Sequence, residues 1–109
     1  NCIIYGNKRE EIEVLTANDP PINFNYTFTN CLMKVDTFSQ NMVDCITNQD
    51  PLFSDVDAYN FKIDSILSPA NNAGTPSAIP SGSFSGPNSD IIGINRSVQP
   101  AIGAYAIPN

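Results

Sequence analysis

The 109-residue sequence contains no histidine, the commonest general base in enzymes and the commonest metal ligand. This absence excludes a Ser-His-Asp or Cys-His mechanism within the chain. Basic residues are also scarce, with 5 Lys and Arg against 11 Asp and Glu, and the net charge is −6. We expect no nucleic-acid binding, because neutralising phosphates requires clustered Lys and Arg. No run of about 18 apolar residues occurs, so we expect no membrane span.

Charged residues make up 15% of the chain, below the roughly 25% typical of globular domains. The hydrophobic fraction of 41% is nevertheless too high for intrinsic disorder. Asn, Ser, Thr and Gly supply the polarity, and their short side chains favour strands and tight turns over helices. The length suffices for one small domain, which we expect to be all-β.

The chain has three cysteines, Cys2, Cys31 and Cys45. An odd number of cysteines without CxxC spacing argues against a disulfide framework and against a zinc site. Free cysteine often behaves as a small buried apolar residue, and we interpret these thiols in that way. We expect no cofactor, and we assign no catalytic, cofactor-binding or metal-binding residue.

The cysteines mark the clearest internal repeat. Residues 1–4 (NCII) resemble residues 30–33 (NCLM), and residues 44–47 (DCIT) form a weaker third copy. The first two copies are 29 residues apart and the next two are 14 apart, while solenoid repeats have periods of about 20 to 50 residues. The repeat therefore favours a coil of parallel strands in which each rung packs on the rungs above and below.

Such a coil predicts which repeated side chains stack. Cys2 would lie over Cys31 as an inward ladder, and Asn1 over Asn30 at a corner, with amides bonding along the stack. Alternating apolar and polar residues predict two further strands, at 11–15 and 23–29. No segment has a convincing helical period; the nearest, 36–46, we interpret as a loop or a single short turn.

The second half of the chain changes character. Residues 68–89 contain four prolines and three glycines, a composition that leaves little room for regular hydrogen bonding. A flexible linker is one interpretation. We favour an ordered loop lying on the coil, because apolar residues are interspersed and a solenoid needs a terminal cap. We therefore expect one structural unit, with β-helix rungs at 1–67 and a covering loop and cap at 68–109.

Several blocks resemble the C-terminal region of right-handed parallel β-helix repeat proteins from bacterial surfaces and secretomes, the pectate-lyase-like solenoids. The blocks are DPLFSD at 50–55, YNFKI at 59–63, LSPANNAG at 67–74, DIIGINR at 90–96 and PAIGAY at 100–105. Together with the Asn-Cys copies they span nearly the whole chain. The third block is similar to an SPAIDAG-type block of that family.

The resemblance implies a right-handed parallel β-helix with an irregular C-terminal cap, from an exported protein that is extracellular or on the bacterial cell surface. It is specific for fold and weak for activity, because such proteins include lyases, hydrolases and adhesins. Asn71 and Asn72 stand where the family has an acid, so an ion or salt bridge that depends on this acid is not carried over. The abrupt apolar start suggests a fragment of a longer protein.

The leading hypothesis is a noncatalytic, structural or carbohydrate-binding segment. The alternative is the C-terminal end of a polysaccharide lyase or glycoside hydrolase whose active site lies upstream of this chain. A pair of carboxylates can hydrolyse glycosides, but eleven acids in so short a chain make chance pairs frequent. Enzyme activity within the chain is therefore not expected, although the full protein could be an enzyme.

Clustered carboxylates provide a weak case for Ca²⁺ binding, since calcium takes six to eight oxygen ligands. The residues are Asp50, Asp55, Asp57 and Asp64. They do not follow the EF-hand pattern, so turn acids and strand caps are the favoured interpretation. Arg96, the only positive charge after Lys62, could hold the cap by pairing with Asp90, or with Asp55 or Asp57.

Aromatic side chains could provide stacking platforms for the sugar rings of a polysaccharide. The candidates are Tyr5, Phe24, Tyr26, Phe28, Tyr59 and Tyr105. The alternative is that most belong to the core or the cap, because 24, 26 and 28 alternate as on one buried face of a strand. We also expect the strand at 2–4 to have an open edge through which the chain could self-associate.

Overall fold

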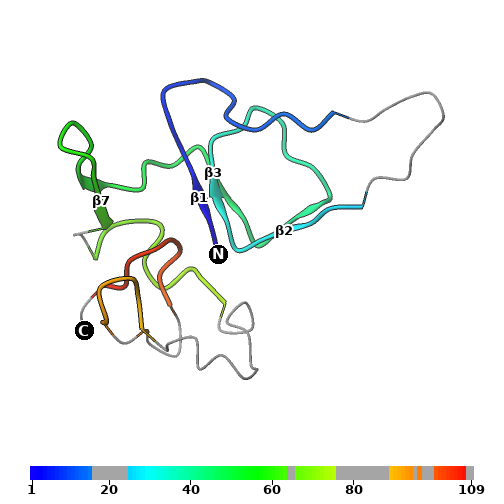
Figure 1. Cartoon of the computed structure of the whole chain (residues 1–109). Coiled ribbons are helices and arrows are strands. Elements are labelled where there is room, and N and C mark those ends of the chain that lie inside the picture. The colour runs from blue at the N-terminus through cyan, green and yellow to red at the C-terminus, as the bar shows by residue number, and fades with distance from the viewer. Residues whose placement is uncertain (16–24, 64–65, 76–88, 95, 97–99, 108–109) are drawn as a thin grey trace.

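A computed structural model of the chain describes residues 1–15, 25–63, 66–75, 89–94, 96 and 100–107. These residues form an all-β structure of short strands joined by turns and loops (Figure 1). The strands are β1 (Ile3–Ile4), β2 (Phe28–Thr29), β3 (Leu32–Met33), β4 (Met42–Val43), β5 (Ile46–Thr47), β6 (Phe53–Asp55) and β7 (Asn60–Ile63). Within these ranges there is no helix, and hence none that could cross a membrane.

The three Asn-Cys copies lie side by side in a parallel sheet with the strand order β1-β3-β5. Ile3 pairs with Leu32, and Leu32 pairs with Ile46, so equivalent positions of the repeat are neighbours. The main chain joins the strands through bonds such as Leu32 N–H to the Cys2 carbonyl at 2.9 Å. The alignment made from sequence is thus the register of the sheet.

A second parallel sheet pairs β2 with β4, with Phe28 opposite Met42. Two residues separate each of these strands from the first sheet, and the first of the two is a corner residue: Asn30 before β3 and Asp44 before β5. Both corners have a left-handed backbone, with φ of 49° and 51°. Asn and Asp tolerate this conformation better than other non-glycine residues. The repeated Asn or Asp therefore turns the chain sharply from one sheet into the other.

Alternating side chains of β3 point to two separate clusters, as expected when successive residues face opposite sides of a sheet. Leu32 is fully buried on one side, in a cluster with Ile63, Ala70 and Ile102. On the other side, Met33 is buried with Cys31 and Val35 against Phe28 and Met42 of the second sheet.

The hairpin of β6 and β7 departs from the expectation that rungs extend over 1–67. These strands pair antiparallel, with Phe53 opposite Ile63 and an irregular register at Asp55. The Asp55 carboxylate accepts the Ala58 N–H at 3.1 Å, and Tyr59 has a left-handed φ of 57°. A side chain that binds the turn backbone allows the short connection that antiparallel strands require.

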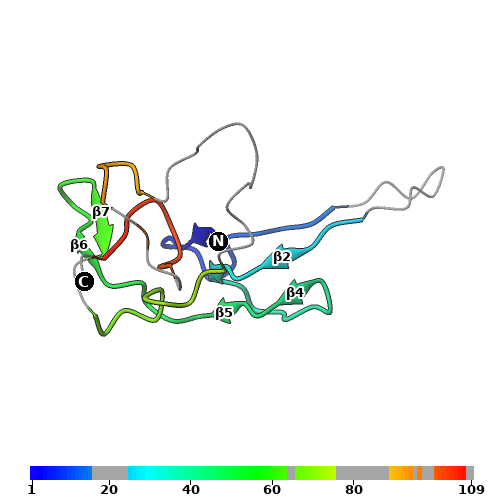
Figure 2. The ribbon, with the colours of Figure 1, turned by 90° about the horizontal axis from the view of Figure 1, so that it is seen from below.

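The C-terminal segment lies beside the parallel sheet (Figure 2). Its Ala70 and Ile102 pack against Leu32 of that sheet. The expected Asn ladder does not form along the stack. The Asn1 side chain instead exchanges two hydrogen bonds with the Thr75 backbone, both 2.8 Å long, and the Asn30 amide donates to the Ala73 carbonyl at 3.0 Å. Both amides thus bind residues 73–75, because the backbone of this segment lies within hydrogen-bond distance of Asn1 and Asn30.

Two predicted features of the N-terminal half have different outcomes. The prediction of a strand at 11–15 is wrong. The Glu11 N–H donates to the Lys34 carbonyl at 2.9 Å, but residues 12–15 do not extend this pairing into a ladder. Of the predicted strand at 23–29 the structure describes residues 25–29, of which only Phe28–Thr29 is a strand, although burial alternates from 25 to 29 as predicted. The loop or short turn expected at 36–46 is confirmed for residues 36–41, but Met42–Val43 is β4 and Ile46 begins β5.

Candidate functional site

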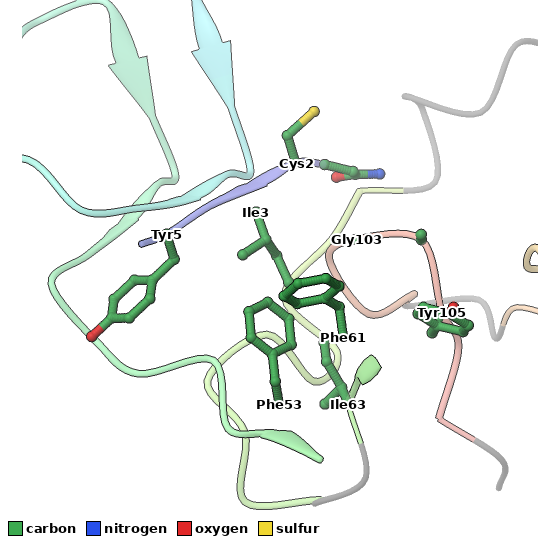
Figure 3. A pocket seen from close by; sticks show the side chains of 10 residues that line it. Cys2, Ile3, Tyr5, Phe53, Phe61, Ile63, Gly103 and Tyr105 are labelled. Atoms are coloured by element: carbon green, nitrogen blue, oxygen red, sulfur yellow. The ribbon is translucent and has the colours of Figure 1, made fainter. Parts of the chain in front are cut away.

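An apolar cavity of about 430 Å³ opens between β1, the β6–β7 hairpin and the C-terminal loop. Its lining consists of Asn1, Cys2, Ile3, Tyr5, Phe53, Phe61, Ile63, Gly103, Ala104 and Tyr105. Figure 3 shows the Phe53 and Phe61 rings below Ile3, with Tyr5 to one side of them and Tyr105 to the other. Its size falls within the range of about 300–1,000 Å³ common for small-molecule sites.

The hairpin places two phenyl rings at the floor of the cavity. Phe53 lies on β6 and Phe61 on β7, and their ring centroids are 5.4 Å apart with an interplanar angle of 84°. This edge-to-face geometry is favourable for aromatic rings because the positive edge of one meets the negative face of the other. The antiparallel pairing therefore builds a rigid aromatic floor that a continued parallel coil would not provide.

Gly103 lets the C-terminal loop approach β1. Its φ of +104° is unfavourable for residues with side chains, and a Cβ here would lie 3.0 Å from Ile3 Cδ1. The Gly103 N–H donates to the Asn1 carbonyl at 3.3 Å. Glycine is thus required both by backbone conformation and by the close contact that closes this wall of the cavity.

Asp90 holds the loop that carries Tyr105. One carboxylate oxygen accepts the Ile92 and Ile94 N–H groups at 3.0 and 2.8 Å, and the other accepts the Ala106 N–H at 2.8 Å. Burial favours the neutral acid, but the three N–H groups and the Arg96 charge outweigh it, and the pKa of Asp90 is lowered. The carboxylate therefore remains ionised and fixes the turn and the loop together.

Arg96 also holds the C-terminal loop, but through backbone carbonyls and not through the expected ion pair with a turn acid. Its guanidinium donates to the Ala101, Gly103 and Ala104 carbonyls at 3.3, 2.9 and 3.2 Å. Arg96 also contributes its charge to the field at Asp90. Arg96 thus holds the cap, as predicted, but it does so by donating hydrogen bonds to backbone carbonyls. A guanidinium group can bind several carbonyls at once because it has five N–H donors.

The aromatic residues predicted as stacking platforms lie in different parts of the structure. Tyr5 and Tyr105 both line the cavity. Tyr26 and Phe28 form an edge-to-face pair 5.8 Å apart on the second sheet, and Tyr59 is 83% exposed on the hairpin turn. Phe24 lies outside the described residues.

Sequence reasoning missed the two central rings, Phe53 and Phe61, as candidates. The available signal was the pair of apolar segments that flank the Asp55–Tyr59 turn, which together have the pattern of a hairpin. We interpreted these segments as parts of parallel rungs, so the two rings were not brought together.

The acidic residues considered for Ca²⁺ do not meet around a common point. Asp50 accepts the Leu52 N–H at 2.8 Å and Asp55 accepts the Ala58 N–H, both within local turns. Asp57 is exposed, and Asp64 lies outside the described residues. In the part of the chain that the structure describes, no three Cys, Asp or Glu side chains are arranged to hold a metal ion.

Comparisons with known proteins return no match to a family model, a curated protein or a solved structure. The function must therefore be argued from the strand arrangement and the cavity.

Proposed function

We propose that this chain is a noncatalytic C-terminal segment of an exported bacterial protein, built as the end of a right-handed parallel β-helix. The observation that carries the proposal is the in-register stack of β1, β3 and β5, repeated beside it by β2 and β4. The left-handed corners at Asn30 and Asp44 occupy equivalent positions before β3 and β5, which supports a repeated turn of the chain. A chain that returns to the same register every turn forms a solenoid.

Asn48 supports the same geometry beyond β5. Its amide donates to the Val35 carbonyl at 2.7 Å, and its side-chain oxygen accepts the Val35 N–H at 3.2 Å. The Asn48 side chain thus takes the hydrogen-bonding role of a neighbouring strand at the point where the pairing of β3 with β5 ends. By the register of β3 and β5 the residue equivalent to Asn48 is Lys34, and the Asn48 side chain bonds the backbone of the residue that follows it, Val35.

Duplicating one turn of the chain tests the solenoid. A variant in which residues 32–45 are repeated adds a whole turn and should retain cooperative unfolding and strand content by circular dichroism, because each turn packs only on its neighbours. The matched control repeats residues 32–38, half a turn, and should unfold because the later strands lose register. Equal stability of the two variants would exclude the solenoid.

The cavity is the basis for proposing carbohydrate binding. One face of a pyranose ring presents C–H groups, and these pack against the flat faces of aromatic rings such as Tyr5 and Tyr105. Among the described residues that line the cavity none carries an acidic or basic side chain, and the chain has a net charge of −6. The ligand class that fits is therefore an uncharged sugar in preference to a polyuronate, which this negative protein would repel.

Titration with neutral oligosaccharides and with oligogalacturonates, followed by NMR or calorimetry, tests the binding. We expect the neutral sugars alone to bind, and Tyr105→Ala to weaken binding at least tenfold while Tyr105→Phe retains it. Tyr59→Ala is the matched control, because this tyrosine is exposed away from the cavity. Binding of neither class, or an equal loss in Tyr59→Ala, would refute the proposed site. Robust turnover of either class would instead favour a lyase or hydrolase.

We also propose self-association through β1. The Cys2 and Ile4 carbonyls accept the Leu32 and Lys34 N–H groups, so the polar groups of Ile3 point away from β3. In the described part of the chain β1 is an edge strand, and such edges pair readily with another chain. Sedimentation should show association that increases with concentration; a monomer at all concentrations would contradict the proposal.

A further inference from the structure

The three cysteines occupy equivalent positions in the parallel sheet. Each directly precedes a residue of the paired set Ile3, Leu32 and Ile46, so Cys31 lies between the other two. Their exposure differs: Cys2 is exposed, Cys45 is half-buried and Cys31 is buried. The middle thiol is therefore the least accessible of the three.

Cys31 and Cys45 are in direct contact within the cluster between the two sheets. The Ile46 N–H donates to the Cys31 carbonyl at 2.8 Å, which fixes the two strands side by side at this position. Cys45 packs against the buried cluster that contains Cys31. Both thiols donate to carbonyls of the same preceding segment, Cys31 to Thr29 and Cys45 to Phe28, each at 3.3 Å. The two sulfurs are thus directed into one small space.

We propose that Cys31 and Cys45 are a redox-sensitive pair that forms a disulfide between adjacent strands when a low-molecular-weight disulfide such as oxidised glutathione is present. Adjacent strands lie about 4.8 Å apart, within the Cα separation of about 4.4–6.8 Å that disulfides require. The same strand spacing is slightly longer than the Cβ separation of about 3.5–4.5 Å that disulfides favour, so the two Cβ atoms must move closer for the bond to form. The bond is therefore moderately strained, and strained disulfides are readily reduced.

The reaction proceeds in two exchanges. The Cys45 sulfur loses its proton and attacks one sulfur of oxidised glutathione, and the broken S–S bond releases the first glutathione, which takes up the proton. The Cys31 sulfur then attacks the Cys45 sulfur, releases the second glutathione and gives up its own proton to it. Two protein thiols are oxidised and one glutathione disulfide is reduced to two thiols.

Tryptic mapping of the full chain tests the pair, because cleavage after the five Lys and Arg residues places the cysteines in separate peptides, 1–8, 10–34 and 35–62. After exposure to oxidised glutathione and trapping of free thiols, we expect peptides 10–34 and 35–62 to be joined. Dithiothreitol should separate them. The reaction should accelerate above neutral pH, because burial raises the pKa of the Cys45 thiol.

Two variants distinguish the pair from the alternatives. Cys2→Ser should leave the linked peptides unchanged, whereas Cys45→Ser should abolish them while its circular dichroism spectrum and thermal unfolding remain those of a folded chain. Joined peptides 1–8 and 10–34 in the wild type would overturn the assignment in favour of Cys2. Glutathione attached only to Cys2, with Cys31 and Cys45 free after complete reaction, would overturn the redox pair altogether.

Discussion

Replacing Asp90 by asparagine should loosen the loop that closes the cavity without disturbing the parallel sheets. Asp90 is 5% exposed, and its two oxygens accept three backbone N–H groups. An amide keeps one oxygen for Ile92 and Ile94 but turns an NH₂ group toward the Ala106 N–H. Ala106 is itself 3% exposed, so this donor loses its partner in a place that water does not reach.

The expected loss combines two costs. An unsatisfied buried donor costs about 1–3 kcal/mol, and the remaining hydrogen bonds lose the strengthening that a charged acceptor provides. We expect Asp90→Asn to lower the free energy of unfolding by about 2–4 kcal/mol at neutral pH. Asp57→Asn, at an exposed carboxylate on the hairpin turn, is the matched control and should change stability by less than about 0.5 kcal/mol.

The sign of the pH dependence follows from the lowered pKa of Asp90. The stabilisation is fully present above the unfolded-state pKa of about 4 and is lost as pH falls through the lower pKa of the folded state. Urea unfolding followed by circular dichroism should therefore show the wild type and Asp90→Asn converging in acid. Hydrogen exchange at Ala106 should be faster in the variant at neutral pH. A difference in unfolding free energy that is unchanged from neutral to acidic pH would refute the reasoning.

Three further substitutions examine the fold. Leu32→Ala should cost about 2–5 kcal/mol in urea unfolding because Leu32 is fully buried, whereas Leu15→Ala, at 75% exposure, should change little. Asn30→Val should destabilise by at least about 1 kcal/mol and Asn30→Gly by less, because the corner has a φ of 49°; equal losses would contradict the corner's role. Gly103→Ala should destabilise by more than about 1 kcal/mol, since its Cβ would meet Ile3 at 3.0 Å; unchanged thermal unfolding would contradict this.

The parallel sheet was predictable because its information is local and repeated. The Asn-Cys copies can be aligned by eye, and the alignment equals the register that the structure shows. The alternation of exposed and half-buried side chains at 25–29 was predictable for a similar reason, because a segment with one half-buried face has a hydrophobic period of two residues. The strand expected at 11–15 has the same alternation, but in the described part of the chain only Glu11 bonds a neighbouring backbone and no ladder forms, because periodicity does not reveal which backbone lies beside a segment.

The candidate site was less predictable, because its walls come from distant parts of the chain. Tyr5 and Tyr105 could be named as aromatic candidates, but nothing in the sequence places them around one cavity with Phe53 and Phe61. The direction of the hairpin decides where the phenyl rings point. That direction depends on a turn held by Asp55 and on an irregular register, neither of which hydrophobic pattern specifies.

By itself the sequence determined the all-β character, the register of the three repeated strands and the residue type at the sharp corners, because short-range periodicity and backbone preference govern these features. Only the tertiary structure decided which polar side chains fasten the tail. Asn1 binds Thr75, 74 residues away, and Asp90 binds Ala106, where sequence reasoning expected an Asn ladder and an ion pair with Arg96. Hydrogen-bond partners so far apart are set by where packing brings the backbone, and no local pattern encodes that position.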